Sequence, residues 1–98
     1  MAAPIHHSRS TSEAKRLRKE AGEWLRSRRQ KADLSQIDLA NRLGLKYYTF
    51  ISQIENGLGR VPSELTEAWA RALGVPPADF AKKLLRYYDP ETYRLVFR

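Results

Sequence analysis

One stretch of the sequence decides the fold: Leu34-Ser-Gln-Ile-Asp-Leu-Ala-Asn-Arg-Leu-Gly44, followed through Ile51-Ser-Gln-Ile-Glu-Asn-Gly57 to Pro62. Apolar residues in both halves recur at the three- and four-residue steps of an α-helix. Each half ends at a glycine, a residue that adopts the left-handed backbone conformation of a tight turn without strain. The stretch therefore predicts two short helices joined by a turn, the first of them starting at Asp33 or Ser35.

The same spacing of apolar residues predicts three more helices around this pair. Ser10 and Glu13 form a capping box before the first helix, and Asp89-Pro90 breaks the last one. The five expected helices cover residues 11–31, about 35–43, 46–56, 63–73 and 77–88. The sequence thus predicts a compact all-α domain over residues 11–88, preceded by a flexible basic tail at residues 1–10. Residues 89–98 carry too much apolar surface for a free tail, so we expect them to pack on the domain or on a second subunit.

Length and composition exclude several classes of protein. A chain of 98 residues can bury one modest core but not two domains. It has no cysteine, which excludes disulfides, thiolate zinc sites and cysteine nucleophiles. No apolar run is long enough to span a membrane, and the sequence offers neither well-spaced paired carboxylates nor a glycine-rich phosphate loop. We therefore expect a cytoplasmic protein that is not an enzyme and takes no cofactor, metal or small-molecule ligand.

Positive charge is concentrated at the N-terminal end. Residues 1–31 hold nine Lys and Arg against three acids, a net charge of +6, whereas residues 32–98 hold nine against eight, a net charge of +1. Such asymmetry favours a polyanionic partner, because Lys and Arg that neutralise phosphates release condensed counterions. A solvated basic helix is the alternative explanation.

The deciding stretch resembles the helix-turn-helix of the phage repressor and Cro class, also called the XRE family. The resemblance covers about residues 25–85 and rests on matches in the family's order: Ser35-Gln36, Leu39-Ala40, Gly44, Ile51-Ser52, Ile54-Glu55, Gly57, Pro62 and Ala72-Leu73-Gly74-Val75. It implies a repressor-like fold with the helix-turn-helix in the second and third helices, and binding to double-stranded DNA. It also implies a structural ion pair between Arg29 and Glu55.

The outward face of the third helix carries the candidate base-reading residues. If Ile51 and Ile54 face the core, helical geometry places polar side chains on the opposite side. The second helix of such a motif enters the major groove, where a glutamine can bond N6 and N7 of adenine together. The candidates are Thr49, Gln53, Ser52, Tyr48 and Lys46.

Hydrogen-bond donors around this helix are candidates for phosphate contacts. They are Gln36, Asn56, Gly59 and Arg60. Gln36 stands at the start of the second helix, where free N–H groups favour an anion, and the resemblance implies the same role for it. Basic residues before and along the first helix either extend this footprint or form a solvated face: Arg9, Lys15, Arg16, Arg18 and Lys19.

The turn departs from the family pattern by one residue. From Ala40 to Ile51 is eleven residues where the pattern has ten, so one extra residue lies within Leu45-Lys-Tyr-Tyr48. Phe50 could therefore replace Ile51 in the core, which would rotate the outward set of side chains. Of the two tyrosines, Tyr47 is expected to cap the core.

These features together predict a transcriptional regulator, most simply a repressor, that reads a palindromic operator through the major groove as a homodimer. Two reading helices one DNA turn apart multiply the discrimination that one provides. The candidate dimer contacts are the surplus apolar residues Trp69, Tyr88, Tyr93, Leu95 and Phe97. The alternative is a protein-interaction module, an antitoxin-like or adaptor subunit with the same fold, which a large apolar patch on the third helix would favour.

Overall fold

The computed structural model describes the backbone of residues 3–98 and the side chains of residues 11–98. Over this range the regular elements are all helical and no strand occurs. They are α1 (Ala3–Lys31), α2 (Gln36–Arg42), α3 (Thr49–Glu55), the short 3-10 helix η1 (Ser63–Leu65), α4 (Thr66–Leu73), α5 (Pro77–Tyr88) and α6 (Pro90–Val96).

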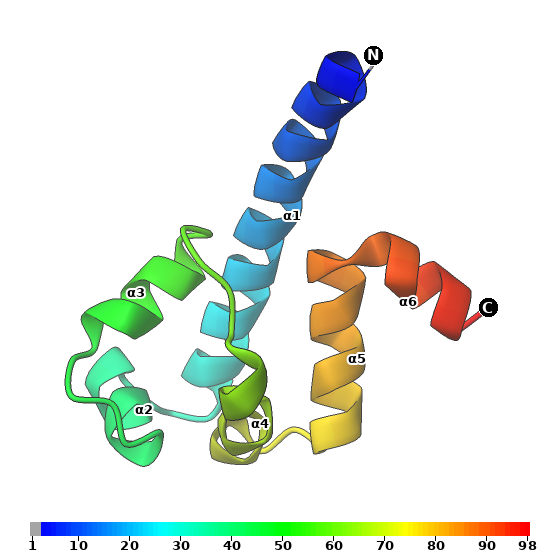
Figure 1. The fold of residues 1–98 in the computed structure, drawn as a ribbon. Coiled ribbons are helices and arrows are strands. Elements are labelled where there is room, and N and C mark those ends of the chain that lie inside the picture. Colours follow the sequence, from blue (N-terminus) through cyan, green and yellow to red (C-terminus); the bar gives the residue numbers. More distant parts are fainter. Residues whose placement is uncertain (1–2) are drawn as a thin grey trace.

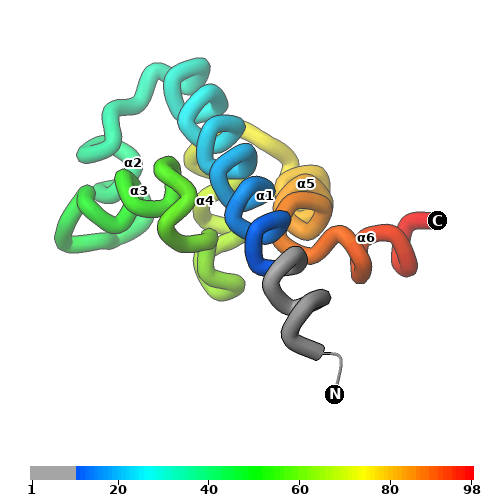
Figure 2. Tube along the Cα trace, turned by 90° about the horizontal axis from the view of Figure 1, so that it is seen from above, coloured from blue at the N-terminus to red at the C-terminus, as the bar shows by residue number. Residues whose placement is uncertain are grey.

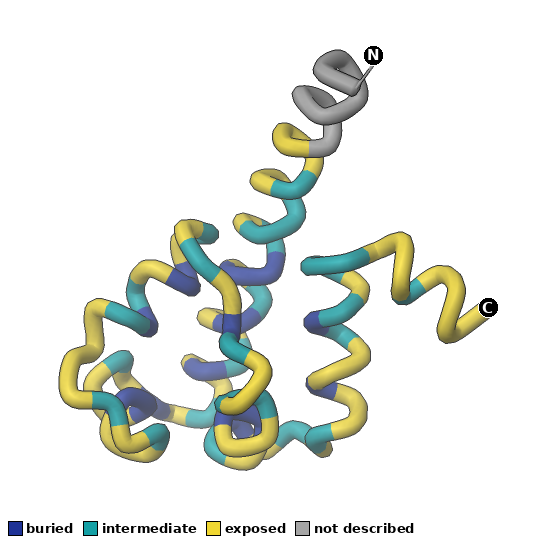
Figure 3. The backbone as a smooth tube through the Cα atoms, in the orientation of Figure 1, coloured by how far each residue is buried: buried dark blue, intermediate teal, exposed yellow. Residues whose placement is uncertain are grey.

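Helix α1 runs through the centre of the molecule. Helices α2 and α3 lie on one side of it and α5 on the other, as two perpendicular views show (Figures 1 and 2). The positions where these helices face one another are the buried ones (Figure 3). The buried core consists of Leu25, Leu34, Leu39, Ala40, Ile51, Ile54, Val61, Trp69, Ala70, Leu73, Phe80 and Leu84.

Local signals define the start of α2. Ser35 is its N-cap: the Ser35 hydroxyl accepts a hydrogen bond from the Asp38 N–H at 3.0 Å, and the Asp38 carboxylate accepts one from the Ser35 N–H at 2.9 Å. The hydrogen bond from the Ser35 N–H lowers the pKa of the Asp38 carboxyl below its ordinary value, and the Ser35 side chain lowers it further by a smaller amount. Asp33 lies outside the helix, so of the two predicted starts Ser35 is the one used. Gly44 follows the helix at a φ of +71°, as its place in the turn predicts.

Three helices have boundaries that differ from the prediction. Helix α3 begins at Thr49 and not at residue 46, so residues 46–48 belong to the turn before it. Helix α1 begins at Ala3 and not near residue 11, so it includes most of the stretch predicted to be a tail, while residues 1–2 lie outside the described residues. The predicted helix over residues 63–73 is divided into η1 and α4. Within α4, Trp69, Ala70 and Leu73 are buried and Ala68 is exposed.

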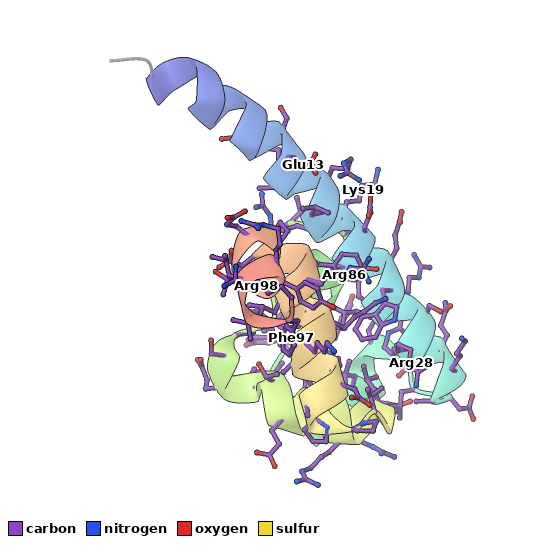
Figure 4. All side chains as sticks on the ribbon, turned by 90° about the vertical axis from the view of Figure 1, so that its right-hand side faces the viewer. Glu13, Lys19, Arg28, Arg86, Phe97 and Arg98 are labelled. Carbon is purple, nitrogen blue, oxygen red and sulfur yellow. The ribbon has the colours of Figure 1, made fainter. Side chains whose placement is uncertain are left out.

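Residues 90–96 form a helix that the sequence reading did not predict, which makes six α-helices in the described chain where five were expected. Asp89-Pro90 was interpreted as a break alone. It is also a helix start, because the Asp89 carboxylate accepts from the Thr92 N–H at 3.2 Å and proline suits the first helical position. The Tyr93 and Phe97 rings lie 5.1 Å apart on one face of α6, and Lys82 of α5 lies 4.6 Å from the Phe97 ring centroid. Figure 4 shows this side of the molecule, with Phe97 labelled.

Two of the five predicted dimer contacts lie inside the subunit. Trp69 is fully buried in the core. Tyr88 packs against the core, and its hydroxyl accepts a hydrogen bond from the Val61 N–H at 3.1 Å. The prediction for these two residues is wrong because both side chains pack within the subunit. Leu95 of α6 and Phe97, which follows that helix, are exposed.

Candidate nucleic-acid interface

The backbone of α1 is in direct contact with the backbone at the end of α3. A Cβ on Gly22 would lie 2.3 Å from the Glu55 carbonyl oxygen, and one on Gly57 would lie 2.8 Å from Lys19 Cα. Such separations are too short for real atoms, so a side chain at either position would force the helices apart. The sequence reading missed Gly22. The available signal was a glycine inside an otherwise helical pattern. Glycine weakens a helix, so its presence there suggests that another segment packs closely against it.

A buried ion pair ties the same end of α3 to α1. Arg29 Nε lies 2.6 Å from Glu55 Oε2 and Arg29 Nη2 lies 3.0 Å from Glu55 Oε1, with 8% and 3% of the two side chains exposed. Arg29 Nη1 also donates to the Leu34 carbonyl at 2.8 Å. The structure therefore contains the pair that was predicted from the resemblance. Glu55 is fully engaged and serves to seat α3.

Gln36 takes part in this cluster. Its amide nitrogen Nε2 donates to Glu55 Oε1 at 3.0 Å, and the side chain is half-buried at the start of α2. The sequence assigned this side chain to a DNA phosphate. An amide nitrogen carries two hydrogens, so a phosphate contact through the second one is compatible with the bond to Glu55 and stays a prediction.

The outward face of α3 is polar. Ile51 and Ile54 are fully buried and Phe50 is half-buried, so the register with Ile51 in the core is the one adopted and the alternative with Phe50 is wrong. Opposite the two isoleucines, Thr49 and Gln53 are exposed, as is Asn56 at the end of the helix, while Ser52 is half-buried. The structure brings together the candidates predicted to read bases, with Tyr48 and Lys46 exposed just before the helix.

The extra residue of the turn pushes an aromatic side chain outward. Tyr47 is 64% exposed, with Lys46 Nζ 5.5 Å from its ring centroid. The prediction that Tyr47 caps the core is wrong, because Leu45 and Phe50 already cover the core at this end. A shallow hollow of about 300 Å³ lies beside α3, lined by Leu45, Lys46, Tyr47, Thr49, Phe50 and Gln53.

The loop after α3 contacts Tyr88 of α5 through Arg60 and Val61. Arg60 is exposed, and its guanidinium carbon lies 4.6 Å from the ring centroid of Tyr88, next to the hydrogen bond that the Tyr88 hydroxyl accepts from Val61. Burial raises the pKa of the Tyr88 hydroxyl, while the hydrogen bond from the Val61 N–H and the charges of Arg60 and Arg18 oppose that rise. Gly59 is half-buried in the same loop. Of the predicted phosphate donors, Asn56 is exposed at the end of α3, whereas Gly59 and Arg60 lie in the loop that follows it, with Arg60 against Tyr88 of α5.

In the part of the chain whose side chains are described, no group of three or more His, Cys, Asp or Glu is arranged to hold a metal ion. None of the described helices is long and apolar enough to cross a membrane. The side chains of His6, His7 and Arg9 lie outside the described residues. A larger hollow of about 470 Å³ lies between α1, α5 and α6.

Two short helices joined by a glycine turn, with a polar face on the second, define a helix-turn-helix protein. Comparison with protein families agrees, because the profile of the helix-turn-helix domain family matches residues 20–82. This match covers more than half of the chain, and the chain belongs to that family. No curated protein matches the sequence. A helix-turn-helix domain indicates a DNA-binding regulator.

Proposed function

We propose that the protein is a sequence-specific regulator of transcription of the phage repressor and Cro type, which inserts α3 into the major groove of double-stranded DNA. The observation that carries this proposal is the outward face of α3, where exposed Thr49, Gln53 and Asn56 form a row of hydrogen-bonding groups. Base edges in the major groove offer donors and acceptors that such side chains can match. Gln53 reads an adenine, and Thr49 and Ser52 contact neighbouring bases, with Tyr48 and Lys46 at the groove edge.

Phosphate contacts position this helix. Arg60 supplies the charge, while Asn56, the backbone at Gly59 and the second amide hydrogen of Gln36 add neutral donors. The stacking of Arg60 on Tyr88 supports this role, because a guanidinium held against a ring loses less freedom when it binds.

We further propose that two copies bind a palindromic operator and act as a repressor by occupying it. Exposed apolar side chains on α6 support association, since Leu95 is 50% and Val96 60% exposed. Together with Tyr93 and Phe97 they form the proposed dimer contact. A twofold axis would repeat the reading helix one DNA turn away.

A protein-interaction module is the second candidate, and a specific observation favours it. Ile37, Tyr47 and Leu58 are 56%, 64% and 78% exposed on the elements around α3. Apolar side chains grouped around a polar helix suit a protein partner as well as the methyl group of thymine.

Selection from a random duplex library, followed by binding measurements over a salt series, tests the proposal. We expect a palindromic site. Gln53→Ala should relax one base position by about 1–3 kcal/mol, whereas Arg60→Ala should weaken all sequences alike. Binding that is sequence-blind and lost at physiological salt would overturn the proposal and favour a protein partner.

A further inference from the structure

Charge is segregated around α1. At 3.6 residues per turn, Lys15, Arg18 and Lys19 lie within about 60° of Gly22 on the helical wheel. The acids of this helix, Glu13, Glu20 and Glu23, lie about 100° or more away. Arg16 belongs to the acidic side, where it pairs with Glu13 at 2.6 Å and Glu20 at 2.5 Å. Arg28 and Lys31 also lie about 100° or more from Gly22, so both sides of the helix carry cations but the acids are confined to one side.

The basic face points to the side where α3 lies. Gly22 marks this direction, because its backbone contacts that of Glu55 at the end of α3, and Lys19 lies against Gly57 one turn further on. Beyond this contact α3 ends, but α1 continues (Figure 1). The face that carries Lys15 therefore runs on past the reading helix with no helix in front of it.

The basic residues of this face are free to bind an anion. Among the described side chains, no carboxylate lies within ion-pair distance of Lys15, Arg18 or Lys19, in contrast to Arg16. Lys15 and Lys19 are exposed, and Arg18 is half-buried. Arg60, the proposed phosphate contact, is exposed in the loop that follows α3 and adds a further positive charge outside the helix.

Groove dimensions place DNA phosphates at the level of this face. The major groove is about 8.5 Å deep, and packed helices lie about 8–10 Å apart. When α3 sits on the floor of the groove, the helix packed directly behind it lies level with the phosphates at the rim. The backbone contacts at Gly22 and Gly57 show that α1 packs closely against the end of α3.

We infer that the basic face of α1, formed by Lys15, Arg18 and Lys19, binds the DNA backbone at the rim of the groove that α3 reads. This inference rests on the proposed function and adds a second line of phosphate contacts to it. The contacts carry no base information, because they reach only phosphates, and they increase the affinity of each subunit for any sequence.

The test compares Lys15→Gln/Lys19→Gln with Lys82→Gln/Lys83→Gln, which removes the same charge from α5 on the far side of α1. Binding of the full chain to its selected site is followed by fluorescence anisotropy over a salt series. We expect the plot of log K against log salt to be less steep for the α1 variant by about 0.9 for each lost contact, which is about 2 for each bound subunit. The α5 variant should keep the wild-type slope. Circular dichroism should show both variants folded, and sedimentation equilibrium should show that both associate like the wild type, because Lys82 contacts Phe97 of the proposed dimer contact.

A second arm locates the contacts on the DNA. Single phosphates of the site are replaced by uncharged methylphosphonates. If the inference holds, some of these replacements weaken DNA binding by the wild type but not by the α1 variant. Identical methylphosphonate profiles, or equal slopes for the α1 and α5 variants, overturn the inference while leaving the proposed function intact. Failure to select any site overturns the proposed function instead, and a changed base preference in the α1 variant shows that the face does more than bind phosphate.

Discussion

Glu55→Gln is the substitution that tests most directly how α3 is held in place. The Glu55 carboxylate accepts three hydrogen bonds: from Arg29 Nε to Oε2 at 2.6 Å, and to Oε1 from Arg29 Nη2 and Gln36 Nε2, both at 3.0 Å. A glutamine replaces one of these oxygens by an amide nitrogen that cannot accept. One orientation of the amide loses the Nε bond, and the other loses both bonds at Oε1. Either leaves the Arg29 charge uncompensated in a site where 8% of its side chain is exposed.

Glu55→Gln is expected to lower the free energy of unfolding by a large fraction of its total. Removing one partner of a buried ion pair costs about 3–5 kcal/mol, against a total of about 5–15 kcal/mol for a typical domain. Urea denaturation followed by circular dichroism measures it. Glu67→Gln is the matched control, because Glu67 pairs with Arg71 at 2.6 Å while both side chains are 67% exposed, and such pairs contribute less than about 1 kcal/mol.

A double substitution separates charge from packing. Arg29→Met/Glu55→Met removes both charges together, so it should destabilise less than Glu55→Gln alone. If Glu55→Gln costs no more than Glu67→Gln, the pair does not behave as a buried one and the reasoning is refuted. If the double variant is as unstable as the single one, the cost comes from lost hydrogen bonds and packing, not from an uncompensated charge.

Three further substitutions test other contacts. Gly22→Ala should destabilise by about 1–3 kcal/mol in urea through its clash with Glu55, despite a gain of about 1 kcal/mol in helix propensity, and a stabilised variant would contradict the contact. Tyr88→Phe leaves the Val61 N–H without its partner, so we expect a loss of about 1–3 kcal/mol and weaker binding to all DNA sequences; an unchanged melting curve would argue against this bond. Leu95→Asp should keep the fold but shift sedimentation equilibrium toward monomer, and unchanged association would exclude this face of α6 as the dimer contact.

The helix-turn-helix could be predicted because its signals are local. A hydroxyl N-cap at Ser35, a glycine at Gly44 and apolar steps ending at Ile54 each act within a few residues, and the structure contains all three. The same locality explains why the outward face of α3 was assigned correctly. Once Ile51 is buried, helical geometry determines which side chains lie opposite it.

What could not be predicted depends on contacts between distant segments. Gly22 is needed because the end of α3 lies against it, 33 residues away in sequence, and nothing next to Gly22 states this. Trp69 and Tyr88 looked like surplus apolar surface because the size of the space between α1, α4 and α5 is set by all three helices together. The outward position of Tyr47 likewise follows from Leu45 and Phe50 having already filled that end of the core.

Helix α1 links the packing of the domain to its proposed electrostatics. Lys15, Gly22 and Arg29 are spaced by seven residues, which is close to two helical turns, so they share one face with a drift of about 20° per step. The backbone contact at Gly22 and the ion pair at Arg29 fix the rotation of this face toward α3. Because a straight helix rotates as one body, the same contacts also determine that Lys15 lies on the α3 side of α1. The contacts that hold α3 against α1 therefore also direct the basic residues of α1 toward the side of α3, where the proposed phosphate contacts lie.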